Sequence, residues 1–407
     1  MKTLKPISNL DRIEFLDILR GMAIFFIFTA NIPFFSGLWF FEPDHPTREI
    51  NLASDEALRY IHYVFVDGKF YSIFSLLFGI GCVIQYNNAI SKGVSFASFF
   101  NKRMFWLLVI GLIHLFLFWA GDILTLYALL GFVLVWFVKK SDKTLLITAA
   151  ILILTPILNW AFMHYTKINY YNYLFGIENS IYAYYNMPTI KFDGGMMPNF
   201  QFYLQNENIL NLIKMNLGNG FGRFGMILEE GRFFKVFGIF LIGLWTGRRI
   251  LNGNLLTQKP FLKKVFWIGL LIGLPFNLTR GYLQFYADKN TLNEFLHVLC
   301  YALGTVPLAL SIAAGIALLC LKGNRFLKLF TSVGKTALTC YLVHTLAGIV
   351  IFYGFGFELA GKYGYTIVML IAAMIFLGQV IISSIWLKYF RYGPMEWVWR
   401  KLVYRLS

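Results

Sequence analysis

A single histidine within a long apolar segment is the residue best placed to do chemistry. His114 lies in IGLIHLFLFWAGDIL, where no ionisable side chain other than His114 occurs between Arg103 and Asp122. Neutral imidazole costs less to bury than a charged group, and it can accept and return a proton near neutral pH. Asp122 can orient the ring only if the chain turns at Gly121, because a straight helix would hold the two side chains apart. The pattern indicates a general base with a carboxylate partner, and a hydrogen-bonded packing histidine is the alternative.

A second histidine lies in the apolar stretch GKTALTCYLVHTL. His344 can also exchange a proton near neutral pH, so it is a further candidate catalytic residue. Tyr341 precedes it by three residues and offers a hydroxyl that can bind substrate. Packing within a helical bundle is the competing interpretation for His344.

Three polar residues in the first apolar run are candidates for substrate binding. Asp17 and Arg20 in LDILRG are three residues apart, so a helix places them on one face, where they can pair. Arg20 also suits a phosphate group, because guanidinium donates parallel hydrogen bonds. Asn31 lies further along the run and can bind a ligand or a neighbouring helix. A charged side chain inside a membrane costs about 2.5–3.5 kcal/mol on insertion scales, so each charge needs a partner or a function.

The segment VDGKFYSIFSLLFGIG carries Asp67 and Lys69 at the start of the second helix. Gly68 between them predicts a turn or a break. We expect both side chains to line a substrate site at the outer mouth of this helix, and anchoring at the membrane surface is the alternative.

Long apolar runs supply the elements that must hold these side chains. Hydrophobic residues make up 58% of the 407 residues, charged residues only 14%, and mean hydropathy is +0.63. Soluble domains are about one quarter charged, and about 20 apolar residues cross a bilayer as a helix. The sequence therefore predicts an all-α polytopic membrane protein with about ten transmembrane helices. They are expected near 16–41, 62–87, 104–120, 123–138, 144–163, 233–250, 264–279, 295–321, 333–357 and 364–387.

The net charge of +16 is divided between the two sides of the membrane. With the N-terminus inside, basic pairs such as Lys102-Arg103 and Arg248-Arg249 fall on inner segments, and most acidic residues fall outside. This positive-inside pattern predicts that both termini are cytoplasmic. The sequence has no stripe of basic residues interleaved with aromatic residues, so it gives no sign of a nucleic-acid-binding site. The four cysteines lie in apolar runs without metal-ligand spacing, so we expect no metal site.

One transmembrane domain is expected over residues 1–407, with two segments that do not cross the membrane. The segment at about 164–232 is rich in Tyr and Asn, and we expect short amphipathic helices on the outer interface. They would form an aromatic belt or a platform for sugars. The segment at about 391–407, RYGPMEWVWRKLVYRLS, predicts an amphipathic helix along the inner surface that begins at Pro394.

Several of these stretches together resemble the YeiB-like family, also called domain of unknown function 418. The matching pieces are LDILRG, FVDGKFYSIFSLLFGIG, IGLIHLFLFWAGDIL, GKTALTCYLVH and RYGPMEWVWRKLVY, in this order along nearly the whole chain. In the family the position of Asp67 more often holds Glu, and the position of His344 often lacks His. The LDxxRG start and the GKxALxxYLxH element are also similar to a clan of ten-helix transmembrane acyltransferases.

The resemblance implies an acyltransferase of the bacterial plasma membrane, with acyl-CoA as the cytoplasmic donor and a glycan or lipid at the outer face as the acceptor. Arg20 and inner basic residues would bind the donor phosphates. His114, oriented by Asp122, would be the base, and membrane lipids would surround the protein. A proton-coupled transporter of a small solute would use the same buried polar residues. A non-enzymatic envelope scaffold is the third alternative.

Overall fold

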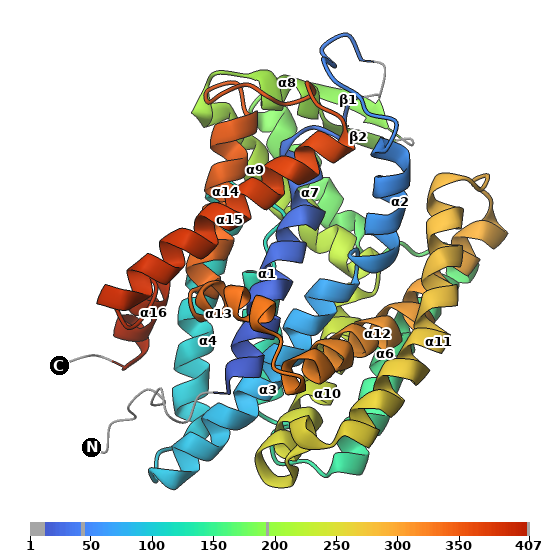
Figure 1. Ribbon diagram of the computed structural model, residues 1–407. Helices are drawn as coiled ribbons and strands as arrows, with labels where there is room; N and C mark the ends of the chain where they lie inside the picture. Colours follow the sequence, from blue (N-terminus) through green and yellow to red (C-terminus); the bar gives the residue numbers. More distant parts are fainter. Residues whose placement is uncertain (1–12, 42–44, 193–194, 405–407) are drawn as a thin grey trace.

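The computed structural model is built almost entirely of helices, and it describes residues 13–41, 45–192 and 195–404 (Figure 1). The longer helices are α1 (Glu14–Phe35), α2 (Asp55–Phe65), α3 (Lys69–Ser91), α4 (Phe96–Ile113), α5 (Leu124–Leu134), α6 (Asp142–Thr166), α7 (Asn172–Tyr184), α9 (Ile209–Glu229), α10 (Arg232–Gly253), α11 (Lys259–Phe285), α12 (Thr291–Leu321), α14 (Ala337–Phe352), α15 (Tyr365–Tyr389) and α16 (Pro394–Tyr404). The shorter elements are the π-helical turn η1 (His114–Phe118), α8 (Phe200–Gln205), η2 (Leu255–Thr257), η3 (Arg325–Lys328) and α13 (Leu329–Lys335). The strands β1 (Thr189–Phe192) and β2 (Gly195–Pro198) pair as an antiparallel hairpin.

Seven helices within the described ranges are long and apolar enough to cross a membrane, where the sequence predicts about ten. They are α1, α2 with α3, α4 with η1, α6, α11, α12 and α15. The other three predicted spans are not single helices that are both long and apolar enough to cross a membrane. α5 has only 11 residues, and α10 carries Lys235 inside its apolar run and Arg248-Arg249 near its end. α13 and α14 are bent by 83° and would make an eighth span only if the pair crosses as one.

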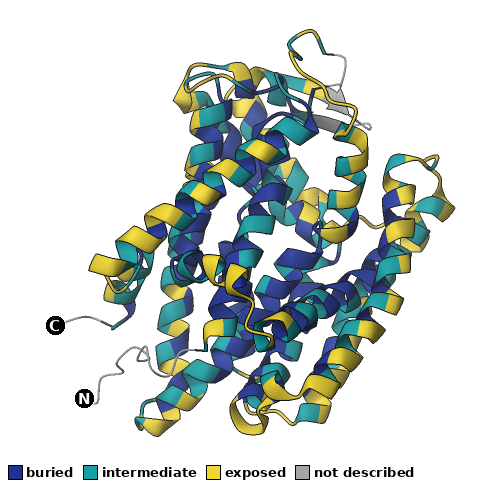
Figure 2. Ribbon diagram, in the orientation of Figure 1, coloured by how far each residue is buried: buried dark blue, intermediate teal, exposed yellow. Residues whose placement is uncertain are grey.

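The outward faces of the long helices are apolar. Figure 2 shows exposed residues along α11 and α15 and buried residues along α1 and α3. Leu271 on α11 is 70% exposed, and Met374 on α15 is 71% exposed. Large exposed apolar faces mark contact with a membrane or a partner. Here they lie on helices of membrane-spanning length, as expected of a protein that lies in lipid.

Two glycines let α1 and α13 cross at backbone contact. A Cβ atom added at Gly334 would lie 1.8 Å from the carbonyl oxygen of Asp17, and one added at Gly21 would lie 2.0 Å from that of Phe330. Small residues permit this close approach between membrane helices. The crossing sets the start of α14 beside the first turns of α1. We call this end of the bundle the inner end and the opposite end the outer end, after the predicted orientation.

A helical hairpin around Gly121 carries His114. α4 continues as η1, and the chain then turns back into α5. π-Helical turns are frequent at functional sites. Gly111 allows the two helices to approach, because a Cβ atom there would lie 2.6 Å from the backbone nitrogen of Thr125. The hairpin brings Asp122 back toward the histidine.

The insertion expected on the outer interface is folded into the bundle at α9. α9 packs along α7 and also against η1. A Cβ atom at Gly220 would meet the Phe116 ring, and one at Gly222 would meet the Glu178 carboxylate. α9 therefore packs its glycine-rich face against two other elements, α7 and η1.

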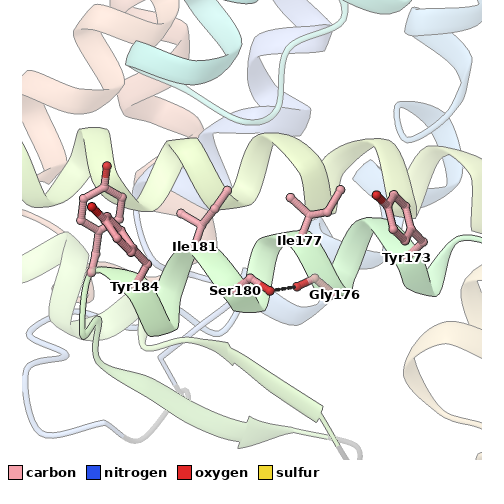
Figure 3. Close-up of a pocket in the computed structure, with 7 residues that line it drawn as sticks. Tyr173, Gly176, Ile177, Ser180, Ile181 and Tyr184 are labelled. Atoms are coloured by element: carbon pink, nitrogen blue, oxygen red, sulfur yellow. Dashed lines mark hydrogen bonds between the residues drawn. The ribbon is translucent and has the colours of Figure 1, made fainter.

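α7 does present an aromatic side to its surroundings. Tyr173, Ile177, Ile181 and Tyr184 lie along one side of the helix and line a shallow hollow of about 580 Å³ (Figure 3). Tyr173 and Tyr184 are 75% and 79% exposed. Tyrosines are enriched at membrane interfaces, so an aromatic belt stays our prediction for this helix.

Another side of α7 carries a carboxyl group with a displaced pKa. Burial raises the pKa of Glu178 from 4.5 to about 7, although a 2.6 Å hydrogen bond from the Tyr182 hydroxyl opposes the shift. The unfolded chain releases this proton near pH 4.5, whereas the folded chain keeps it until about pH 7. The folded state therefore binds more protons in this window, and stability falls as pH rises through it.

We expect Glu178→Gln to flatten this pH dependence, in melting temperatures measured in detergent across the same window. The variant should gain stability relative to the unmodified protein as pH rises toward 7. Glu207→Gln, at an exposed position, is the matched control and should melt like the unmodified protein. Equal pH slopes for all three proteins would show that Glu178 ionises normally.

Most of the predicted C-terminal segment forms α16, and 405–407 lie outside the described residues. Pro394 is the first residue of the helix, where its missing N–H costs nothing. The Glu396 carboxylate accepts hydrogen bonds from the backbone nitrogen of Leu338 and from the hydroxyl of Thr339, both at 2.6 Å. α16 thereby caps the start of α14 and packs against α4 at the inner end.

Candidate functional site

His114 is the centre of a buried hydrogen-bond network. Its Nδ1 lies 2.8 Å from Oδ1 of Asp122, and its Nε2 lies 2.9 Å from the hydroxyl of Thr345. His114 and Asp122 are each 2% exposed. A carboxylate that accepts from Nδ1–H fixes the tautomer in which Nε2 is a proton acceptor. The three groups have the order carboxylate, imidazole and hydroxyl that activates a hydroxyl in many enzymes.

Two elements hold this network in place. The second oxygen of Asp122 accepts a hydrogen bond from the backbone nitrogen of Thr125 at 2.7 Å, at the start of α5. Tyr341 on α14 has its ring centre 5.2 Å from the imidazole. Thr345 lies four residues further along α14 and therefore on the same face. The structure thus brings together three predicted site residues, namely His114, Asp122 and Tyr341.

α9 adds polar groups from the insertion. Arg223 lies within Coulombic range of Asp122 and Tyr341, and its Nε has no hydrogen-bond partner among the described residues. Asn216 on the same helix is 1% exposed, and neither of its amide atoms has a partner in the described part of the chain. Buried polar atoms without partners are rare in folded proteins. They mark the surroundings of α9 as a place for water or for a polar ligand.

His344 takes no part in the His114 network. Its ring stacks on Phe28 of α1, with the ring centres 4.0 Å apart and the planes inclined by 6°. Successive side chains on a helix point about 100° apart, so Thr345 and His344 face different neighbours. The His344 ring therefore packs against Phe28, while its buried Nε2 has no hydrogen-bond partner among the described residues. Asn31 lies half-buried on α1, one turn beyond Phe28.

A cavity of about 330 Å³, which we call the inner cavity, is lined by residues of α1, α3, α4, α5, α10, α13, α14 and α16. Its charged lining is Asp17, Arg20, Arg103, Lys335, Glu396 and Arg400. Its apolar lining includes Ile24, Leu77, Phe78, Leu107 and Leu124. Tyr341 also lines the cavity and contacts the His114 ring. The cavity therefore leads from a basic inner end to the side chain beside the buried histidine.

Both carboxylates of the inner cavity are engaged by the protein. Asp17 and Arg20 form the ion pair that their spacing predicts, at 2.9 Å. Glu396 binds the amides of α14, and burial raises its pKa although those hydrogen bonds oppose the shift. The guanidinium of Arg103 stacks 3.8 Å over the ring of Trp399. An excess of basic groups in the lining of a cavity favours an anionic ligand such as a phosphate.

Asp67 and Lys69 lie elsewhere, at the outer end of α3. The predicted break is present at Gly68, whose φ is +81°, a conformation that glycine adopts at little cost. Asp67 pairs with Arg280 at 2.8 Å, and Lys69 donates to the Asn277 side chain at 2.8 Å. Lys69 is 0% exposed, so it does not anchor the chain at the surface. None of the hydrogen bonds found among the described residues joins Asp67 or Lys69 to the histidine network.

Sequence reasoning did not select Thr345 or Arg223. Thr345 is four residues beyond Tyr341, so the helical face that carries Tyr341 was a usable signal. Arg223 lies in LGNGFGRFG, inside the insertion that was expected on the surface. The repeated glycines were the available signal, because they indicate a helix that packs closely.

Comparisons with known proteins group this chain with others of unassigned activity. A family model described as "Protein of unknown function (DUF418)" matches residues 247–406. The uncharacterized protein YxaH of Bacillus subtilis (strain 168) is 30% identical, over 99% of this chain and 97% of that protein. The uncharacterized protein YeiB of Escherichia coli (strain K12) is 27% identical, over 96% of each chain. No solved structure matches. Any function must therefore be argued from the site itself.

Proposed function

We propose that this chain, which belongs to the DUF418 family, is a multi-pass membrane acyltransferase. It would take an acyl group from acyl-CoA at the inner face and pass it to a glycan or lipid at the outer face. The observation that carries the proposal is that the inner cavity ends at Tyr341, beside the buried His114–Asp122 pair. A cavity that leads from basic side chains to the neighbour of a buried base suits this reaction.

The lining of the inner cavity fits the chemistry of an acyl-CoA donor. CoA carries phosphate groups that need cationic partners, and Arg20, Arg103 and Lys335 supply them at the entrance. The acyl and pantetheine portions need an apolar channel, which Leu77 and Leu107 help to form. The volume lies within the range of about 300–1,000 Å³ that is usual for small-molecule sites.

His114 would act as the general base. Asp122 holds Nδ1–H, so Nε2 is the nitrogen that accepts a proton. An acceptor hydroxyl that takes the place of Thr345 at Nε2 would give up its proton as its oxygen attacks the thioester carbon. The carbon–sulfur bond would then break, and the imidazolium would return the proton to the leaving thiolate. The ester product and free CoA balance the reaction.

The orientation that we propose places both termini in the cytoplasm, with ten segments crossing or embedded in the plasma membrane. The asymmetry of loop charge supports it. α5 packs on α4, and α10 packs between α3 and α6, so the elements that are too short or too charged to span alone lie inside the bundle. The basic entrance of the inner cavity then faces the compartment that holds acyl-CoA.

Filling the inner cavity should weaken donor binding without unfolding the protein. Gly81 on α3 lines the cavity, and a Cβ atom there would meet nothing within 4 Å. We expect Gly81→Leu to reduce the affinity for a long-chain acyl-CoA by about tenfold or more, measured by titration of the purified protein in nanodiscs. Gly378→Leu, on α15 with equal open space, should bind like the unmodified protein. An unmodified protein that fails to bind acyl-CoA would reject the proposed donor.

A further inference from the structure

Four basic side chains are gathered near the outer ends of α3, α10 and α11, away from the inner cavity. We call Lys69, Arg232, Lys235 and Arg280 the outer cationic cluster. Lys69 and Lys235 are both 0% exposed, and Arg280 is 7% exposed. Lys235 is close enough to the other three basic groups to interact with them electrostatically. Four positive groups in one buried region are unusual, because each loses hydration on burial.

Only two carboxylates of the described residues join this cluster by ion pairs, and each binds an arginine. Asp67 pairs with Arg280 at 2.8 Å, and Glu230 pairs with Arg232 at 2.5 Å. The hydrogen bonds found for the two lysines go to neutral oxygens. Lys69 donates to the Tyr63 carbonyl and the Asn277 side chain. Four basic groups therefore share two carboxylates, and the hydrogen bonds of the two lysines among the described residues reach no carboxylate.

Lys235 contacts neutral groups of one tyrosine. Its Nζ donates to the Tyr301 carbonyl at 2.7 Å and lies 3.2 Å from the centre of the Tyr301 ring. The ring face attracts a cation, but it does not neutralise one. The Nε atoms of Arg232 and Arg280 are buried and have no hydrogen-bond partner in the described part of the chain. Donors therefore remain for a ligand.

We propose that the outer cationic cluster binds a phosphate group, carried by a phospholipid headgroup or by a water-soluble phosphate ester. A phosphate supplies negative charge and several acceptor oxygens, which matches the surplus of basic groups over carboxylates and the unpartnered arginine Nε donors. The side chain of Asp67 is 43% exposed and that of Glu230 is 36% exposed, so the cluster is open at these two carboxylates. This binding site stands independently of acyl transfer.

The experiment measures ligand-induced stabilisation of the purified protein in neutral detergent. One arm adds phosphatidylglycerol and, as its uncharged match, diacylglycerol with the same chains. The other arm adds glycerol phosphate and, as its match, glycerol. We expect the phosphate member of one pair to raise the melting temperature and the uncharged member to leave it unchanged. A response to the lipid alone identifies a headgroup, and a response to glycerol phosphate identifies a soluble ester.

Lys235→Met should bind the responding phosphate about tenfold or more weakly. The variant should fold, because it removes a buried charge that lacks a carboxylate partner and keeps an apolar chain of similar length. Arg232→Gln, at a partly exposed position, is a second variant with the same expected loss. Lys263→Met removes one charge from an exposed position and should respond like the unmodified protein. A protein that responds to neither phosphate, or variants that respond like the control, would overturn the proposal.

Discussion

Replacing His114 by glutamine is expected to slow acyl transfer by roughly 10²–10⁴-fold, the usual contribution of a general base. Glutamine has no imidazole nitrogen that can accept a proton at neutral pH, but it can still donate to Asp122 and hydrogen-bond Thr345. The fold and the inner cavity should therefore survive. The rate is measured as free CoA thiol released from acyl-CoA in membranes that contain the protein.

Two controls separate catalysis from stability in this experiment. Acyl-CoA affinity and melting temperature should match those of the unmodified protein, because His114 does not line the inner cavity. His164→Gln changes a histidine that stacks on Trp160 near the end of α6, and it should keep full activity. Preserved turnover per folded His114→Gln molecule, together with a lower melting temperature, would show that the histidine is structural.

A valine at position 334 should prevent α1 and α13 from packing. The Cβ atom would lie 1.8 Å from the carbonyl oxygen of Asp17 and 3.0 Å from the backbone nitrogen of Gly21. Backbone atoms cannot move aside as a flexible side chain can, so the two helices must separate. We expect a loss of about 3 kcal/mol or more in the free energy of unfolding. Size-exclusion chromatography in detergent should show little folded Gly334→Val protein.

Gly378→Val is the matched control for this variant. Gly378 lies inside a long apolar helix, and a Cβ atom there would meet nothing within 4 Å. Its folded yield should be close to that of the unmodified protein. A Gly334→Val protein with normal yield and normal melting would mean that α1 and α13 do not cross as closely as described.

The contact between His114 and Asp122 could be predicted from their spacing in the sequence, because a short turn between two helices allows few arrangements of the residues beside it. Two apolar runs joined at Gly121 predict a reversal of the chain, and the contact between His114 and Asp122 follows from that reversal. No spacing rule identifies Thr345, which lies 231 residues away in the chain. Its position depends on how α14 packs against η1, and that packing is decided by many side chains together.

Composition alone did not predict which residues are buried in the insertion and at the outer end of α3. A segment rich in Tyr and Asn was expected on the surface, but α9 buries a glycine-rich face that its average composition conceals. Lys69 was expected at the start of the second helix, and it is the first residue of α3, directly after the break at Gly68. Its complete burial could not be predicted, because its partner Asn277 lies on a helix that is distant in the sequence.

The most direct test of the proposed function is to photolabel the protein with an acyl-CoA that carries a diazirine in its acyl chain. Inside-out membrane vesicles expose the cytoplasmic face to the probe, and right-side-out vesicles expose the other face. We predict labelling only in inside-out vesicles, on peptides of α3 and α4 that contain Leu77 and Leu107, and loss of the label with excess unlabelled acyl-CoA. Label confined to the exposed faces of α11 and α15, label that acyl-CoA does not displace, or labelling only from the outer side would contradict the account.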